Sequence, residues 1–96
     1  MAHLQILFPR STDTQMINRF LSDAVSMKHA RGFRSLKQSE GDIMSPLGPA
    51  PFSKVIEISF DSHEDMMAFA QSRPLEGKEQ LKSLGVVMLI YDVSDV

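Results

Sequence analysis

The order of the periodic segments along the chain is the feature that most constrains its fold. Residues 3–8 and 53–60 alternate apolar and polar side chains, a period of two that is typical of strands with one buried face. Residues 33–40 form a more polar strand candidate, typical of an edge, and residues 86–93 are almost continuously apolar, as in a strand buried on both faces. A helical period follows residues 3–8, and another follows residues 53–60. The order β-α-β-β-α-β predicts an α+β, ferredoxin-like fold, in which two helices cover one face of a four-stranded antiparallel sheet.

Two amphipathic segments supply the expected helices. Residues 11–13 offer N-cap side chains for the first helix, and Gly32 is its predicted stop. The apolar stripe of this helix comprises Met16, Ile17, Phe20, Leu21, Ala24 and Met27. Ser62 caps the second helix, and Pro74 either ends that helix or opens a further short one that Gly85 closes.

Composition excludes several classes of protein. A chain of 96 residues that is 43% hydrophobic with a net charge of −2 predicts one globular domain over residues 1–96. No apolar run approaches the roughly 18 residues of a membrane span, and the first residues lack a signal-peptide pattern, so the cytoplasm is the expected location. Without cysteine there is no disulfide and no thiolate nucleophile.

Nucleic acid is not an expected partner. Ten basic residues against twelve acidic ones leave no excess of positive charge for phosphate contacts. An RNA-recognition module has the same element order, but it stacks bases on aromatic side chains of its third strand. Val55, Glu57 and Ser59 stand at those positions here, and a carboxylate would repel phosphate.

The sheet face that the helices leave open is expected to carry the function. Alternation places on it a mixed set of side chains, which are His3, Gln5, Leu7, Val55, Glu57 and Ser59. This set is too apolar to face water, so a second copy of the chain is predicted to cover it as a homodimer. A small, mostly apolar organic molecule is predicted to bind between the sheet and its cover, in a pocket that these six residues line. The proline- and glycine-rich loop 41–51 is predicted to act as a lid or arm.

Glu57 and His3 are the candidates for chemistry in this set. If a partner removes water from Glu57, its pKa rises and it can act as a general base; the alternative is a salt bridge to a basic residue of a neighbouring strand or subunit. His3 either joins Gln5 and Glu57 in a proton-transfer cluster or solvates an open barrel mouth. No histidines have metal-ligand spacing, so neither a metal site nor a cofactor is expected. Haem is disfavoured because His29 is the only helix-borne histidine available as an axial ligand.

Several short runs resemble the EthD-like proteins of the dimeric α+β barrel superfamily. The runs are Leu4–Pro9, Phe20–Asp23, Gly32–Arg34 and Ile58–Ser62. The resemblance implies a homodimer whose two sheets pack face to face and enclose a cavity for a small organic molecule. The EthD-like pattern has a histidine late in the first helix where this chain has Ala24, which cannot act as a base or ligand. The predicted function is therefore binding of, or chemistry on, a small apolar compound, and the alternative is a non-catalytic ligand-binding or oligomerising module.

Overall fold

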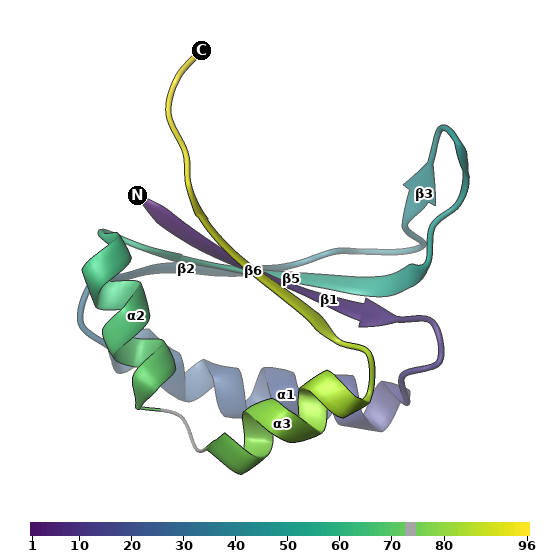
Figure 1. The fold of residues 1–96 in the computed structure, drawn as a ribbon, viewed down its shortest axis with the longest axis horizontal. Helices are drawn as coiled ribbons and strands as arrows, with labels where there is room; N and C mark the ends of the chain where they lie inside the picture. Colours follow the sequence, from purple (N-terminus) through teal and green to yellow (C-terminus); the bar gives the residue numbers. More distant parts are fainter. Residues whose placement is uncertain (73–74) are drawn as a thin grey trace.

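A four-stranded antiparallel sheet with helices on one side forms the centre of the molecule (Figure 1). The computed structural model describes residues 1–72 and 75–96. The strands of the sheet, in spatial order, are β2 (Phe33–Gln38), β5 (Phe52–Phe60), β1 (Ala2–Pro9) and β6 (Val87–Asp92). The helices are α1 (Thr14–Ala24), the 3-10 helix η1 (Val25–His29), α2 (His63–Gln71) and α3 (Leu75–Ser83). The expected ferredoxin-like fold is confirmed, with β2 at an edge as predicted.

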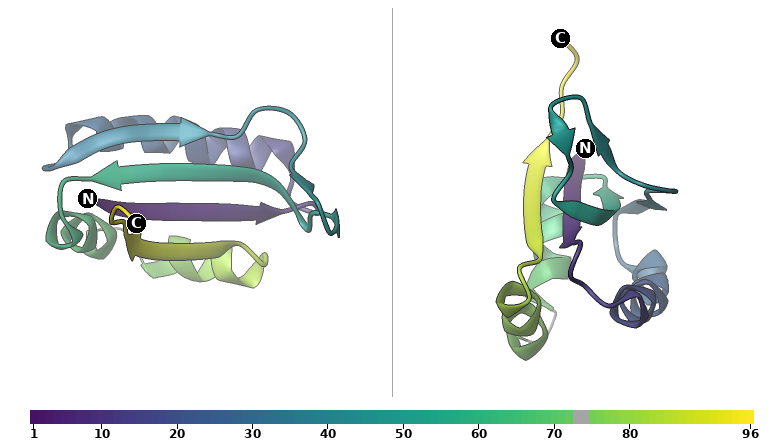
Figure 2. Two further views of the ribbon diagram at one scale, coloured as in Figure 1. Left: turned by 90° about the horizontal axis from the view of Figure 1, so that it is seen from above. Right: turned by 90° about the vertical axis from the view of Figure 1, so that its right-hand side faces the viewer.

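Two segments of the chain contain more regular structure than a single helix and a loop. The second helical region forms two helices, α2 and α3, and the role expected of Pro74 lies outside the described residues. Residues 41–51, predicted to be a loop that acts as a lid or arm, contain a small hairpin of β3 (Met44–Ser45) and β4 (Gly48–Pro49). The hairpin and the C-terminal residues 93–96 both rise on the side of the sheet away from the helices (Figures 1 and 2).

Side-chain caps determine where α1 and α2 begin. The Asp13 carboxylate accepts a hydrogen bond from the Gln15 amide at 2.9 Å, and the Ser62 hydroxyl accepts one from the Asp65 amide at 3.1 Å. Gly32 is not the direct stop of α1, because η1 continues the helical path to His29. It turns the chain into β2 with a positive φ of 78°.

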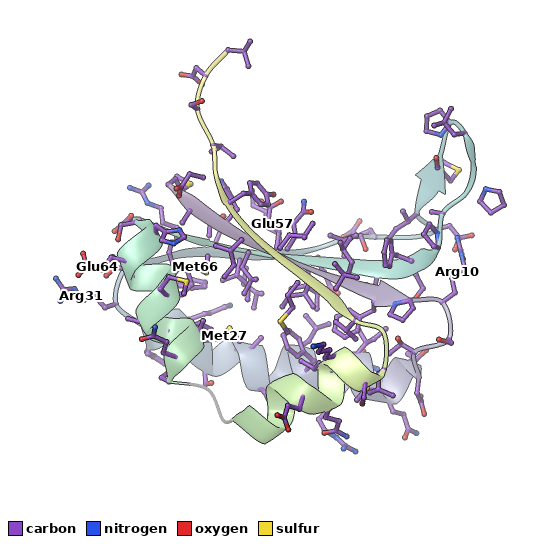
Figure 3. All side chains as sticks on the ribbon, viewed as in Figure 1. Arg10, Met27, Arg31, Glu57, Glu64 and Met66 are labelled. Atoms are coloured by element: carbon purple, nitrogen blue, oxygen red, sulfur yellow. The ribbon has the colours of Figure 1, made fainter. Side chains whose placement is uncertain are left out.

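Alternating side chains of β1 and β5 pack the core against the helices. The fully or nearly fully buried members of this core are Ala2, Leu4, Ile6, Phe8, Ile17, Ala24, Met27, Ile56, Ile58, Phe60 and Met66. Each large apolar side chain removed from water contributes about 1.5–3 kcal/mol. Figure 3 shows Met27 and Met66 on the helix side of the sheet and Glu57 on the opposite side. Because the pleat is this strongly specified, the residues between the core positions must face the open side.

Strand β6 departs from the expectation of burial on both faces. Its side chains from Val87 to Ile90 are 37–47% exposed. The strand lies at an edge of the sheet, beside β1, where the chain itself provides little cover. An apolar run indicates that a strand prefers to be covered, but it does not say whether the cover belongs to the same chain. The prediction of burial is therefore wrong for the single chain.

Candidate functional site

All six side chains expected on the open face are placed there by the strand register. His3, Gln5 and Leu7 of β1 lie directly opposite three residues of β5, which are Ser59, Glu57 and Val55 in that order. Directly opposite residues of an antiparallel pair point to the same side of the sheet. Strand β6 adds Tyr91, Leu89 and Val87 opposite the same residues of β1.

Four of these residues form a polar group at one end of the open face, which we call the His3 cluster: His3, Glu57, Ser59 and Tyr91. His3 Nδ1 lies 2.8 Å from Ser59 Oγ and 3.4 Å from Glu57 Oε1. The imidazole stacks on the Tyr91 ring, with ring centroids 5.6 Å apart. Only 14% of the His3 side chain is exposed, and Ser59 is buried. Within the single chain, His3 is thus largely covered by its neighbours.

Both polar contacts of the imidazole are made by its Nδ1 atom. A carboxylate beside Nδ1 favours a proton on that nitrogen, which leaves the Nε2 lone pair free to accept one. A nucleophilic serine needs the opposite arrangement, with the hydroxyl at Nε2 and the acid at Nδ1. Here both groups approach Nδ1. The cluster can therefore accept a proton or bind a polar group, but it does not have the geometry of a serine nucleophile.

Tyr91 is a member of this cluster that the sequence did not single out. Burial raises the pKa of its phenol, and the nearby Glu57 carboxylate raises that pKa further. The phenol is therefore protonated at neutral pH and can donate a hydrogen bond. The sequence signal for Tyr91 is the alternation of the last strand: Tyr91 lies two residues after Leu89 and so faces the same side of the sheet.

The rest of the open face is uncharged around β1 and β6. Gln5, Leu7 and Val55 are half-buried, and Leu89 and Val87 are exposed. On the other side of β5, Lys37 of β2 pairs in register with Glu57, so a basic residue does lie on the neighbouring strand. The carboxylate contact that the structure shows, however, is with His3. The His3 cluster thus lies at one end of the face, and Leu7, Val55, Val87 and Leu89 form an apolar area beside β1 and β6.

Other features of the described residues lie apart from this face. A cavity of about 420 Å³ lies between the residues that follow η1 and helix α2, and its lining includes Arg31, Asp65 and Phe69 but none of the six predicted residues. In the part of the chain that the structure describes, no group of three or more histidine, aspartate or glutamate side chains is placed to hold a metal ion. Nor does any described helix have the length and apolar character needed to cross a bilayer. Ala24 is fully buried in the core.

Comparison with known proteins supports the architecture. No protein-family model and no curated protein matches the chain. Among solved structures, an EthD family protein from Bacillus halodurans is 24% identical with a TM-score of 0.66, and the match covers 98% of this chain and 99% of that one. The hydroxynitrile lyase of Passiflora edulis is 20% identical with a TM-score of 0.67, covering 99% and 95%. An Arabidopsis thaliana protein is 15% identical with a TM-score of 0.64, covering 99% and 96%. The resemblance indicated by the short sequence runs therefore holds at the level of architecture: the chain has the fold of an EthD family protein.

Proposed function

We propose that a second copy of the chain covers the open face and that a small, mostly apolar organic molecule binds between the two, against the His3 cluster. The observation that carries this proposal is that a polar cluster with a largely covered histidine lies beside exposed apolar residues on one sheet face. His3 is 14% exposed, whereas Leu89 is 47% exposed. Binding sites for small molecules are typically apolar surfaces with a few polar groups that orient the ligand.

The polar groups of the cluster define the chemistry of the ligand. The Tyr91 phenol donates a hydrogen bond, and the Glu57 carboxylate accepts one. His3 Nε2 accepts a proton or a hydrogen bond when the proton of the imidazole is on Nδ1. A neutral compound with one carbonyl or hydroxyl group on an apolar frame matches these donors and acceptors.

The same cluster supports two roles, turnover or binding alone. In turnover, one general base removes a proton from the ligand, and this base is either the Glu57 carboxylate or His3 Nε2. One solved protein of this fold is a hydroxynitrile lyase, which is an enzyme. The buried Ala24 favours the non-catalytic alternative, because the position where the EthD-like pattern has a histidine carries no titratable group.

Fragment binding monitored by ligand-observed NMR tests the site. Neutral alcohols and ketones with apolar frames are expected to bind, and Glu57→Gln is expected to weaken binding of hydroxyl compounds about tenfold, the loss of a charge-assisted hydrogen bond. Glu79→Gln is the matched control, because Glu79 is exposed on α3 and belongs neither to the His3 cluster nor to the lining of the cavity at α2. If no such fragment binds, or if both variants bind like the wild type, the assigned site is wrong.

The homodimer follows from the apolar residues that the open face exposes. Covering the open face would bury Val87 and Leu89, the exposed apolar residues of β6 that pair with Leu7 and Gln5. A specific interface of this kind usually buries more than about 1,000 Å². Light scattering at micromolar concentration is expected to give twice the monomer mass. A cytoplasmic location and a single domain over residues 1–96 stay predictions.

A further inference from the structure

The β3–β4 hairpin is an arm that projects beside the open face (Figures 1 and 2). Met44 pairs with Pro49 and Ser45 pairs with Gly48 across the hairpin. The Leu47 amide donates a hydrogen bond to the Ser45 hydroxyl at 3.2 Å, which closes the turn. Two prolines, Pro46 and Pro49, restrict the backbone of this short segment.

Arg10 lies at the base of the arm (Figure 3) and forms hydrogen bonds on both sides of it. Its Nε donates to the Ala50 carbonyl at 2.6 Å, and its Nη2 donates to the Ile43 carbonyl at 3.3 Å. Its backbone amide donates to the Pro51 carbonyl at 3.3 Å. These bonds tie the residues before and after the hairpin to the end of β1. The arm is therefore attached to the sheet on both sides of its base.

The tip of the arm presents apolar side chains without a cover in the chain. Met44 is 87% exposed and Leu47 is 96% exposed. Residues 44–49 carry no charged side chain. A restrained, uncharged segment that exposes two large apolar side chains is typical of a contact surface. Two large side chains this exposed gain most from contact with a second protein surface or with an apolar ligand held on it.

The arm is too distant to close the His3 cluster of its own chain. Its base lies at the C-terminal end of β1, where Arg10 follows Pro9. His3 lies at the opposite end of this strand, roughly 20 Å away at about 3.3 Å per residue. At that opposite end the C-terminal tail leaves the sheet, because Asp92 pairs with Ala2.

A twofold axis between two facing sheets can bring the arm of one chain to the His3 end of the other chain. If the axis runs across the strands, it reverses the strand direction while each strand stays above its own counterpart. The arm, which connects β2 to β5, then lies over the His3 end of the partner on its β5 side, and the tail stays on the β6 side. Each chain supplies one apolar tip and one receiving surface, as a closed twofold interface requires.

We propose that Met44 and Leu47 of one chain pack over the His3 cluster of a second copy and complete its binding site. This inference rests on the homodimer of the proposed function and adds which segment of the partner closes the site. In this arrangement the apolar part of the ligand contacts the arm, and the polar part contacts His3, Glu57 and Tyr91. The site of each chain is incomplete without the other chain.

Disulfide trapping tests the contact, and the absence of native cysteine makes the experiment clean. The double variant Leu47→Cys/His3→Cys is oxidised under mild conditions and run on a non-reducing gel beside each single variant. A disulfide requires Cβ atoms about 3.5–4.5 Å apart. The double variant is expected to shift largely to twice the monomer mass, and both single variants are expected to stay at monomer mass. Met44→Cys/His3→Cys serves as the second pair, and light scattering gives the mass of every variant before oxidation.

Each other outcome overturns the proposal in a distinguishable way. Cross-linking of Leu47→Cys alone would mean that the two arms meet each other. Loss of free thiols at monomer mass would mean that the arm folds over its own chain. A dimer by light scattering that neither double variant traps would remove the arm from the site and leave the dimer intact. A monomer by light scattering would reject both the dimer and the arm contact.

Discussion

Tyr91 is the single tyrosine of the chain and there is no tryptophan, so phenolate absorbance reports on this residue alone. Because burial and then Glu57 raise its pKa, the titration midpoint of the folded protein is expected above about 10. The folded state keeps the proton longer than the unfolded chain does. The raised pKa of Tyr91 therefore adds to the free energy of unfolding. This contribution is complete below about pH 10 and is lost as the pH rises through the pKa of the folded protein.

Removing the charge of Glu57 separates the two causes of this shift. Glu57→Gln is expected to lower the Tyr91 midpoint, because the carboxylate no longer opposes formation of the phenolate. Burial still holds the midpoint above its usual value. Glu64→Gln provides the control at an exposed carboxylate on α2. Equal midpoints in all three proteins would show that Glu57 does not act on Tyr91.

Two glycines with similar backbone angles provide a second comparison between single residues. Gly32 has a φ of 78° and Gly41 has a φ of 68°. A Cβ at Gly32 would run into the Asp65 carboxylate, whereas a Cβ at Gly41 meets no atom within 4 Å. Gly41→Ala is expected to lower the free energy of unfolding by about 1–2 kcal/mol through the left-handed backbone alone. Gly32→Ala is expected to lower it further in urea unfolding, and equal losses would contradict the close approach of Asp65.

At the level of elements, the attachment of the β3–β4 arm depends on Arg10. Arg10→Met keeps an apolar stem but removes the side-chain bonds to Ala50 and Ile43. The expected loss is about 1 kcal/mol of unfolding free energy. Amide hydrogen exchange is expected to become faster at Leu47 and to stay unchanged at Ile58 in β5. Arg19→Met, at an exposed position of α1, is the control; exchange that is equally slow at Leu47 in both variants would mean that the arm does not need Arg10.

The sequence predicts the elements whose environment is set locally. Alternation in β1 and β5 was sufficient to place Gln5 and Glu57 on the open face, because the pleat has a period of two and one side of it is strongly apolar. It was not sufficient for Tyr91, whose stacking on His3 depends on pairing between the first and last strands of the sheet. The β3–β4 hairpin was also missed, since its attachment is a long-range contact of Arg10 that no local pattern encodes.

At the level of the whole molecule, substitutions at two adjacent residues of β6 can distinguish an effect on dimer formation from an effect on folding. Leu89 is 47% exposed and pairs with Gln5 on the open face, and Met88 is 41% exposed and pairs with Ile6 on the helix side. Leu89→Glu is expected to give a folded monomer by light scattering, because a carboxylate would be buried in the interface. Met88→Glu is expected to remain a dimer. A dimeric Leu89→Glu protein would show that the interface lies elsewhere.

The central position of β1 in the sheet also bears on how the chain folds. β1 lies between β5 and β6. Both edges of this first strand can therefore be paired only after the two last strands of the sheet have been synthesised. During synthesis from the ribosome the sheet cannot be complete until residues 87–92 have emerged. Contacts between distant parts of a chain must overcome the entropy of closing long loops, and they slow folding. A nascent chain that lacks β6 exposes the apolar edge of β1, which makes this interval the stage at which chaperone binding or aggregation competes with folding.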